Sequence, residues 1–131
     1  MYCPVCREEP LIVLEHDEVE VDYCPQCHGV WLDSEEADLL FGSHAVCERF
    51  MSSGRPDPMT AKRKLRCPEC GRVMEKDAAG TGEPVTHDRC VQGHGMWFDE
   101  GELAAIMRRG HELADGDKVE AFLQGLFGEN V

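Results

Sequence analysis

Apolar and polar residues alternate along residues 19–23, whose sequence is Val-Glu-Val-Asp-Tyr. A period of two is typical of a strand with one buried face. The aliphatic run 11–14 precedes this segment, and the bend 16–18 separates the two. The sequence therefore predicts a β-hairpin here. A second, weaker hairpin is predicted from the short apolar segments 73–74 and 85–87, joined by a longer connection that contains two glycines.

Two later segments have the period of amphipathic helices. Each begins with an aspartate followed three residues later by a glutamate, Asp33 with Glu36 and Asp99 with Glu102, which is the spacing of a capping box. The residues that then share one helical face are Ala37, Leu40, Phe41, His44 and Met51 in the first segment and Leu103, Ile106, Met107 and His111 in the second. Residues 117–127 carry a third apolar stripe, which predicts a C-terminal amphipathic helix.

The chain contains an internal repeat. The segment Cys-Pro-x-Cys at 3–6 returns at 67–70, and the segment Gly-x-Trp-x-Asp at 29–33 returns at 95–99. Self-similarity of this kind indicates two copies of one structural unit. The predicted order in each copy is a Cys-x-x-Cys turn, a hairpin, a second ligand turn, a tryptophan and a helix. We expect the two tryptophans to cover a metal site and to pack on the following helix.

Six of the eight cysteines form three Cys-x-x-Cys pairs, a spacing that places two thiolates on one face of a tight turn. The N-terminus shows no apolar signal segment, so this spacing favours metal binding over disulfides. Two pairs separated by 17 residues have the spacing of a zinc ribbon. The first site is therefore predicted to consist of Cys3, Cys6, Cys24 and Cys27.

The second site departs from this pattern. Counted back from the tryptophans, Gly93 stands in the place of Cys27, and the nearest donor is His94. An imidazole reaches further than a thiolate, so His94 is the expected fourth ligand, with His87 as the alternative. The second site is thus predicted to consist of Cys67, Cys70, Cys90 and His94.

Both predicted sites have four protein ligands, which is typical of structural zinc and leaves no open position for catalysis. Each half of the chain is too short to bury a large core, and small domains of this size usually need a metal or disulfides. We therefore expect two Zn²⁺ ions per chain, with iron as the alternative because thiolate ligands accept both. Cys47 has no partner in this pattern and is expected to be a small buried apolar residue.

Charge narrows the choice of partners. The chain has 131 residues, of which 26 are acidic and 13 basic, so its formal net charge is −13. Residues 1–54 alone hold 12 acidic and 2 basic residues, a net charge of −10. Such a surface disfavours binding to nucleic acid or to an anionic membrane. The one basic cluster precedes the second copy, and an alternative nucleic-acid surface would use Lys62, Arg63, Lys64, Arg66, Arg72 and Arg89.

The first copy resembles the bacterial zinc-ribbon family named after the zinc finger of transcription factor IIB. The resemblance rests on the two Cys-Pro-x-Cys turns of the first copy and on Gly29-Val30-Trp31-Leu32-Asp33 with its acidic helix. The second copy is similar at residues 67–70, Cys90 and 95–99, and departs at Gly93 and His94. The resemblance implies zinc-ribbon modules and a role associated with transcription or nucleic acid, but no particular reaction.

Together these patterns predict a small metal-stabilised α+β protein made of two tandem zinc ribbons and a C-terminal amphipathic helix. The predicted divisions are a first ribbon with its helix, a linker, a second ribbon with its helix, and a helical tail, at residues 1–51, 52–63, 64–111 and 112–131. We expect a non-enzymatic, cytoplasmic adaptor that binds protein partners. The stripe at 117–127 would pack on the protein itself or form a homodimer surface.

Overall fold

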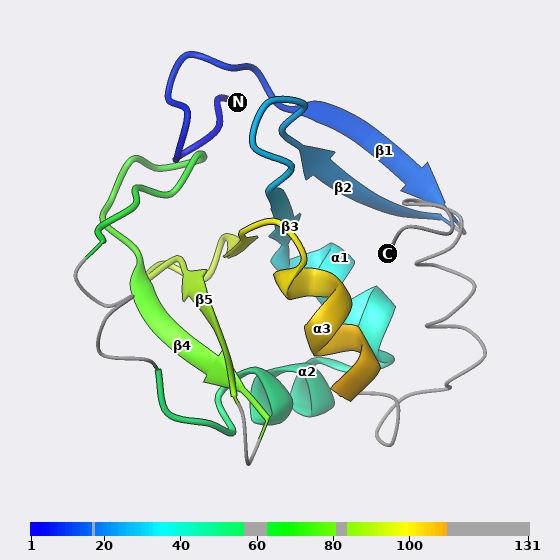
Figure 1. Ribbon diagram of the computed structural model, residues 1–131. Helices are drawn as coiled ribbons and strands as arrows, with labels where there is room; N and C mark the ends of the chain where they lie inside the picture. Colours follow the sequence, from blue (N-terminus) through cyan, green and yellow to red (C-terminus); the bar gives the residue numbers. More distant parts are fainter. Residues whose placement is uncertain (17, 57–62, 81–83, 110–131) are drawn as a thin grey trace.

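The computed structural model describes the whole chain except residues 17, 57–62, 81–83 and 110–131 (Figure 1). The predicted helix at 117–127, with its homodimer surface, lies outside the described residues. The described part is a small α+β fold built on one antiparallel sheet, whose six strands lie in the order β1-β2-β3-β6-β5-β4. None of the helices in the described ranges has the length and apolar character needed to cross a membrane.

The first hairpin agrees with the sequence prediction. Strand β1 (Ile12–His16) pairs with β2 (Val19–Tyr23), and Leu14 lies opposite Val21. Val19 and Val21 are buried while Glu20 is exposed, as the alternation requires.

The second hairpin differs from its prediction. Strand β4 (Glu75–Ala79) begins after the apolar pair 73–74, and it pairs with β5 (Val85–Arg89). The residues of β4 have low strand propensity, so its position is set by tertiary contacts. One of those contacts comes from the predicted linker, where the backbone N–H of Gly54 donates to the carbonyl of Ala78.

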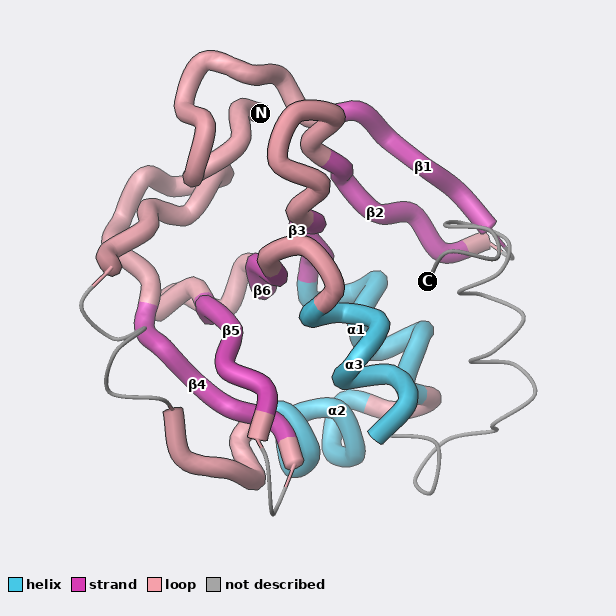
Figure 2. Tube along the Cα trace, viewed as in Figure 1, coloured by secondary structure: helices cyan, strands magenta, loops and turns pink. Residues whose placement is uncertain are grey.

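A pair of short central strands was not predicted. Strand β3 (Val30–Asp33) follows the first copy's second ligand turn, and β6 (Gly95–Phe98) holds the same place in the second copy. They pair antiparallel with Trp31 opposite Trp97, which are equivalent residues of the repeat. The two copies are therefore related by a local two-fold axis between the tryptophans, and they share one sheet (Figure 2).

The predicted first helix is two helices. Helix α1 (Ser34–Phe41) ends at Gly42, whose φ of 91° is left-handed, and α2 (His44–Met51) follows. Glycine adopts this conformation without steric cost, so it ends the helix. Phe41 and Met51 are buried as predicted, whereas the His44 side chain is 65% exposed.

The helix of the second copy, α3 (Glu102–Arg109), begins two residues later in its copy than α1 does. Each copy forms only one half of the predicted capping box. The Asp33 carboxylate accepts the backbone N–H of Glu36 in the first copy, whereas Glu102 accepts the N–H of Asp99 in the second. The aspartate of the pair therefore caps the helix in the first copy, and the glutamate of the pair does so in the second.

The sheet separates two apolar clusters. The helices cover one face, where Leu32 and Phe98 pack with Phe41 and Ile106 (Figure 2). Trp31 and Trp97 point to the other face and pack among the cysteines. The expectation that the tryptophans pack on the following helix is therefore wrong, because successive residues of a strand face opposite sides of the sheet.

The first residues of the predicted linker pack against the second copy. The Ser52 hydroxyl donates to the Asp77 carboxylate, and the N–H of Gly80 donates to the Ser53 hydroxyl. Helix α2 of the first copy also contacts β4 of the second. The part of the linker that the structure describes thus holds the two copies together.

Candidate metal centre

The four cysteines of the first copy converge on one point. The donor atoms of Cys3, Cys6, Cys24 and Cys27 all lie within 4.8 Å of one another. The Sγ atoms of Cys3 and Cys27 are 3.6 Å apart, and those of Cys6 and Cys24 are 3.9 Å apart. A tetrahedron with metal–sulfur bonds of about 2.3 Å has sulfur–sulfur edges of about 3.8 Å. All eight cysteines of the chain are free, and the spacing of this group fits one tetrahedral ion.

The second copy forms an equivalent group from three cysteines and one histidine. The donors of Cys67, Cys70, Cys90 and His94 also lie within 4.8 Å of one another. The Sγ of Cys70 lies 3.7 Å from that of Cys90, and the Nδ1 of His94 lies 3.5 Å from the Cys90 sulfur. A metal bound here would meet the Nδ1 atom of the imidazole.

His87, the alternative fourth ligand, lies elsewhere. It is 1% exposed on β5, and its ring packs against Phe98 with the ring centroids 5.4 Å apart. Neither of its ring nitrogens has a hydrogen-bond partner among the described residues. Burial lowers the pKa of His87 to about 4, so this side chain is a neutral part of the core at neutral pH.

The conformation of the turns explains how a histidine replaces a cysteine. In the first copy His28, directly after Cys27, adopts a left-handed φ of 64°. In the second copy the left-handed residue is Gly93, one position earlier, and its N–H donates to the carbonyl of Cys90. The tighter turn draws the backbone back by one residue, and the longer His94 side chain then reaches the site.

The first copy supports this turn directly. The hydroxyl of Ser34, at the start of α1, donates to the carbonyl of Gly93, and its backbone N–H donates to the carbonyl of His94. This role of Ser34 was not predicted, because no pattern around it in the sequence indicates a contact with a residue of the other copy.

In the second ligand turn of each copy, a backbone N–H group donates to the sulfur of the first cysteine. The N–H of Cys27 donates to the Sγ of Cys24, and the N–H of Gln92 donates to that of Cys90. Burial disfavours the thiolate at both sulfurs, yet backbone N–H groups and hydrogen bonds with the neighbouring cysteine side chains together lower the pKa of both, that of Cys90 to about 7. Since a metal binds the thiolate, these two sulfurs are prepared for coordination.

The two sites border one apolar cluster. Trp31 and Trp97 are each 0% exposed, and they lie among buried cysteines of both sites. Each tryptophan occupies space left by a glycine of the other copy. A Cβ on Gly29 would lie 2.2 Å from Trp97 Cζ2, and a Cβ on Gly95 would lie 2.9 Å from Trp31 Cζ2. The repeated Gly-x-Trp segment is therefore a reciprocal packing motif between the copies.

Two remaining candidates are not ligands in this arrangement. Cys47 is 4% exposed in the helix-side cluster, as expected, and burial raises its pKa to about 12. A hydrogen bond joins His28 Nδ1 to the hydroxyl of Tyr23. In the repeat His28 is the counterpart of His94, so the histidine at this position bonds to a tyrosine in the first copy and belongs to the donor group in the second.

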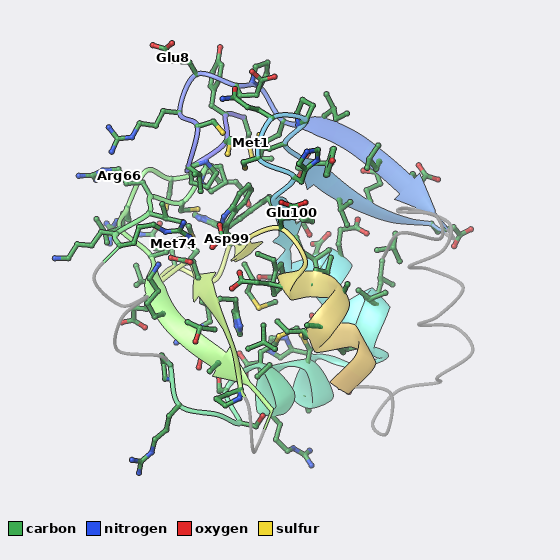
Figure 3. The ribbon with its side chains drawn as sticks, viewed as in Figure 1. Met1, Glu8, Arg66, Met74, Asp99 and Glu100 are labelled. Carbon is green, nitrogen blue, oxygen red and sulfur yellow. The ribbon has the colours of Figure 1, made fainter. Side chains whose placement is uncertain are left out.

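A groove opens between the two Cys-Pro-x-Cys turns. Its volume is about 590 Å³, and it lies where the N-terminal segment meets the start of the second copy. The residues that line it besides Cys3 and Cys67 are Met1, Tyr2, Pro4, Arg7, Lys64, Arg66 and Pro68. Figure 3 shows Arg66 and Met1 in this part of the molecule.

The family described as "transcription factor zinc-finger" matches residues 2–41. This segment holds the four cysteines of the first site, so the similarity to this zinc-ribbon family includes the whole first donor group. The second copy lies outside the match, but the structure gives it an equivalent donor group with a histidine in place of one cysteine. Searches among curated proteins and among solved structures found no match.

Proposed function

We propose that the protein is a non-enzymatic adaptor whose fold is held together by two Zn²⁺ ions and which binds other proteins. The observation that carries the proposal is the closed donor set of each site, four side chains grouped for one tetrahedral ion. Four protein ligands leave no position for a substrate or an activated water. In this role the ions stabilise the fold and take no part in a reaction.

Zinc is favoured over iron by the donors of the second site. Three thiolates with one imidazole are a common ligand set of structural zinc. Zinc binding to finger peptides is worth roughly 10–16 kcal/mol near neutral pH, about as much as the whole net stability of a typical domain. Metal binding therefore supplies stability that two small clusters of apolar residues cannot provide alone.

The choice of protein partners rests on charge. The net charge of −13 repels polyanions, and the acidic residues concentrate in the first copy, whose surface would attract basic partners. The description of the matching family supports a partner associated with transcription. The eight free cysteines are typical of a reducing compartment, which supports a cytoplasmic location.

Nucleic-acid binding is the second candidate, and the structure reduces the surface that it would use. Of the six basic residues predicted for it, Arg63 pairs with Asp99, and Arg89 pairs with Glu75 and Asp77. Lys62 lies outside the described residues. Lys64, Arg66 and Arg72 remain, and the first two of them line the groove. Binding to mixed DNA and RNA at low salt would favour this candidate.

The proposed function is tested by metal analysis combined with interaction measurements. Tag-free protein should contain two zinc ions per chain, and its thiols should react slowly with a thiol reagent until a chelator is added. Cross-linking in cells followed by mass spectrometry should then recover protein partners. Metal-free folded protein, rapid thiol reaction of the native state, or recovery of nucleic acid alone would overturn the proposal.

A further inference from the structure

The groove between the two Cys-Pro-x-Cys turns has an unusual lining for so acidic a protein. All three charged residues that line it are cations, namely Arg7, Lys64 and Arg66, and all three are exposed. Among the described residues, no carboxylate forms an ion pair with any of them. Arg66 uses one guanidinium nitrogen to donate to the carbonyl of Gly71, at 3.0 Å, which fixes its side chain beside the second turn.

The rest of the lining is apolar. Pro4 and Pro68 are equivalent residues of the two turns and stand on opposite copies, and the exposed Tyr2, with 61% of its surface accessible, lies beside them. A tyrosine ring and proline rings bind aliphatic or aromatic side chains at little entropic cost, because they are rigid. The groove therefore offers apolar walls and cationic groups within one short site.

We propose that this groove binds a short acidic segment of a partner protein, one that combines an apolar anchor residue with neighbouring carboxylates. The inference rests on the proposed adaptor function and names the partner's chemistry. Guanidinium groups form charge-assisted, bidentate hydrogen bonds with carboxylates. Two arginines, one from each copy, would hold such a segment across the local two-fold axis.

The small area of the cationic surface favours an acidic peptide over a nucleic acid as the ligand. A nucleic acid carries one phosphate at every nucleotide, so a strand longer than the groove would meet the acidic surface of the first copy. A peptide concentrates its carboxylates over a few residues and leaves its flanks neutral. The groove and the −10 net charge of residues 1–54 thus select a ligand whose negative charge is local.

The two donor groups lie next to the groove and affect its charge and shape. Cys3 and Cys67 lie at the base of the groove, and each belongs to one donor group. Both are buried, at 1% and 3% exposure, whereas the cationic groups are exposed and contact the ligand directly. The thiolate charges therefore act at longer range, and the two ions hold the opposing walls in place.

The direct test is fluorescence polarisation with the zinc-loaded full chain and a labelled octapeptide of alternating glutamate and leucine. Binding should weaken as salt is added. Arg66→Gln should reduce the affinity about tenfold and the double variant Arg7→Gln/Arg66→Gln about a hundredfold, in line with the loss of charged hydrogen bonds. Arg49→Gln, the same charge change on α2 outside the groove, should change it less than twofold. Arg66→Lys keeps the charge but loses the bidentate geometry, so its affinity should lie between those of the native protein and Arg66→Gln.

Matched probes give the outcomes that would overturn the proposal. A peptide with glutamine in place of glutamate should bind at least tenfold more weakly, and so should single-stranded oligothymidine that is long enough to extend beyond the groove. Equal binding of the glutamine peptide, or groove-dependent binding of the oligonucleotide alone, would overturn it. Zinc content and circular dichroism of every variant show that the fold is intact.

A second arm separates this inference from the adaptor function. Proteins cross-linked to the native chain in cells are compared with those cross-linked to the double variant and to Arg49→Gln. Loss of a partner from the double variant alone supports the groove. Equal recovery by all three overturns the groove and leaves the adaptor function standing, whereas no recovered protein overturns both.

Discussion

The two copies of the repeat reach the same donor geometry by different routes. In the first copy Cys27 completes the group and the left-handed residue is His28, which bonds to Tyr23. In the second copy Gly93 takes the left-handed position and His94 completes the group. The distance along the chain from the first cysteine of this turn to the tryptophan is the same in both copies, from Cys24 to Trp31 and from Cys90 to Trp97. The length of this second ligand turn is therefore fixed, whereas the identity of its fourth ligand is not.

Packing across the two-fold axis explains the fixed length. Gly29 and Gly95 must lie against the tryptophan of the other copy, and β3 must pair with β6 in register. One residue more or fewer would turn each tryptophan to the helix side of the sheet. A change of ligand is tolerated because it moves only the turn, which Ser34 holds from the first copy.

The largest effect is expected when one site is destroyed. Cys24→Ala should abolish metal binding in the first copy and unfold both copies in one transition, since the sites border one apolar cluster. The loss should approach the roughly 10–16 kcal/mol of a structural zinc. Circular dichroism and counting of ions per chain would measure it. Cys47→Ala, a buried cysteine outside both groups, should cost only about 1–2 kcal/mol. Persistence of a folded second copy in Cys24→Ala would show that the copies are independent.

A smaller effect is expected from filling the spaces left by the two glycines. In Gly95→Ala the new Cβ would lie 2.5 Å from the Leu32 carbonyl oxygen, a backbone atom that β-pairing holds in place. We expect a loss of about 3 kcal/mol or more, and about 2–3 kcal/mol for Gly29→Ala, where the ring of Trp97 is met.

Urea unfolding of both variants measures these losses, with Gly71→Ala as the control. Gly71 has a φ of 76° but open space around its Cβ, so its substitution should cost only about 1 kcal/mol of backbone strain. If Gly29→Ala and Gly95→Ala cost no more than Gly71→Ala, the reciprocal packing is not tight.

The third prediction exchanges a core residue between the copies. His87 stands where the first copy has Val21, and both side chains are 1% exposed. Because burial lowers the pKa of His87 to about 4, the unfolded chain binds the proton more tightly between about pH 6.5 and 4. The free energy of unfolding should therefore fall as pH drops through this window, by about 3 kcal/mol. His87→Val should remove this fall.

The measurement is urea unfolding of both proteins from pH 7 to pH 4, with bound metal monitored at each pH. The converse variant Val21→His should introduce a similar fall into the first copy. Parallel pH profiles for the native protein and His87→Val would show that the histidine carries no such cost and that the acid response comes from the metal ligands alone.

The smallest effect concerns the glutamate of each capping pair. Burial, with Asp99 and Asp88 nearby, raises the pKa of Glu102 to about 7. The folded state then binds the proton more tightly, so stability is lost as pH rises from about 4.5 to 7. Glu102→Gln should therefore stabilise the protein at pH 8 by about 1–2 kcal/mol, since the group is partly exposed.

Thermal unfolding at pH 5 and pH 8 tests this, with Glu36→Gln as the equivalent change in the first copy. The Glu36 carboxylate accepts the backbone N–H of Glu20, a bond that glutamine can keep, so little change is expected there. An equal gain in both variants would attribute it to the net charge of the protein rather than to burial of Glu102.

The local features of the molecule follow from sequence, whereas its long-range pairings do not. The cysteine spacing predicts both donor groups, and the period of two predicts the first hairpin. The position of β4 does not follow, because its residues Glu75–Ala79 have no strand pattern and are held by contacts with Ser52 and Gly54. The break at Gly42 within the predicted helix was missed, although a glycine there is its visible signal.

The pairing of β3 with β6 has the least obvious signal. Each strand is only four residues long, and the partners lie 66 residues apart at the tryptophans. The signal that was present is the repeated glycine two residues before each tryptophan. A small residue at that place indicates that a large side chain approaches from elsewhere, but not from which segment it comes.

The first copy is synthesised before the second, so Trp31 emerges from the ribosome before Trp97, its partner in the sheet. The ligands of the first site are complete once Cys27 has been made, so that site can take its ion while the ribosome is still translating the second copy. Until residues 95–98 emerge, the β3 edge and Trp31 have no cover. A nascent chain halted between the copies should therefore bind chaperones or a second nascent chain, and release them when Trp97 arrives.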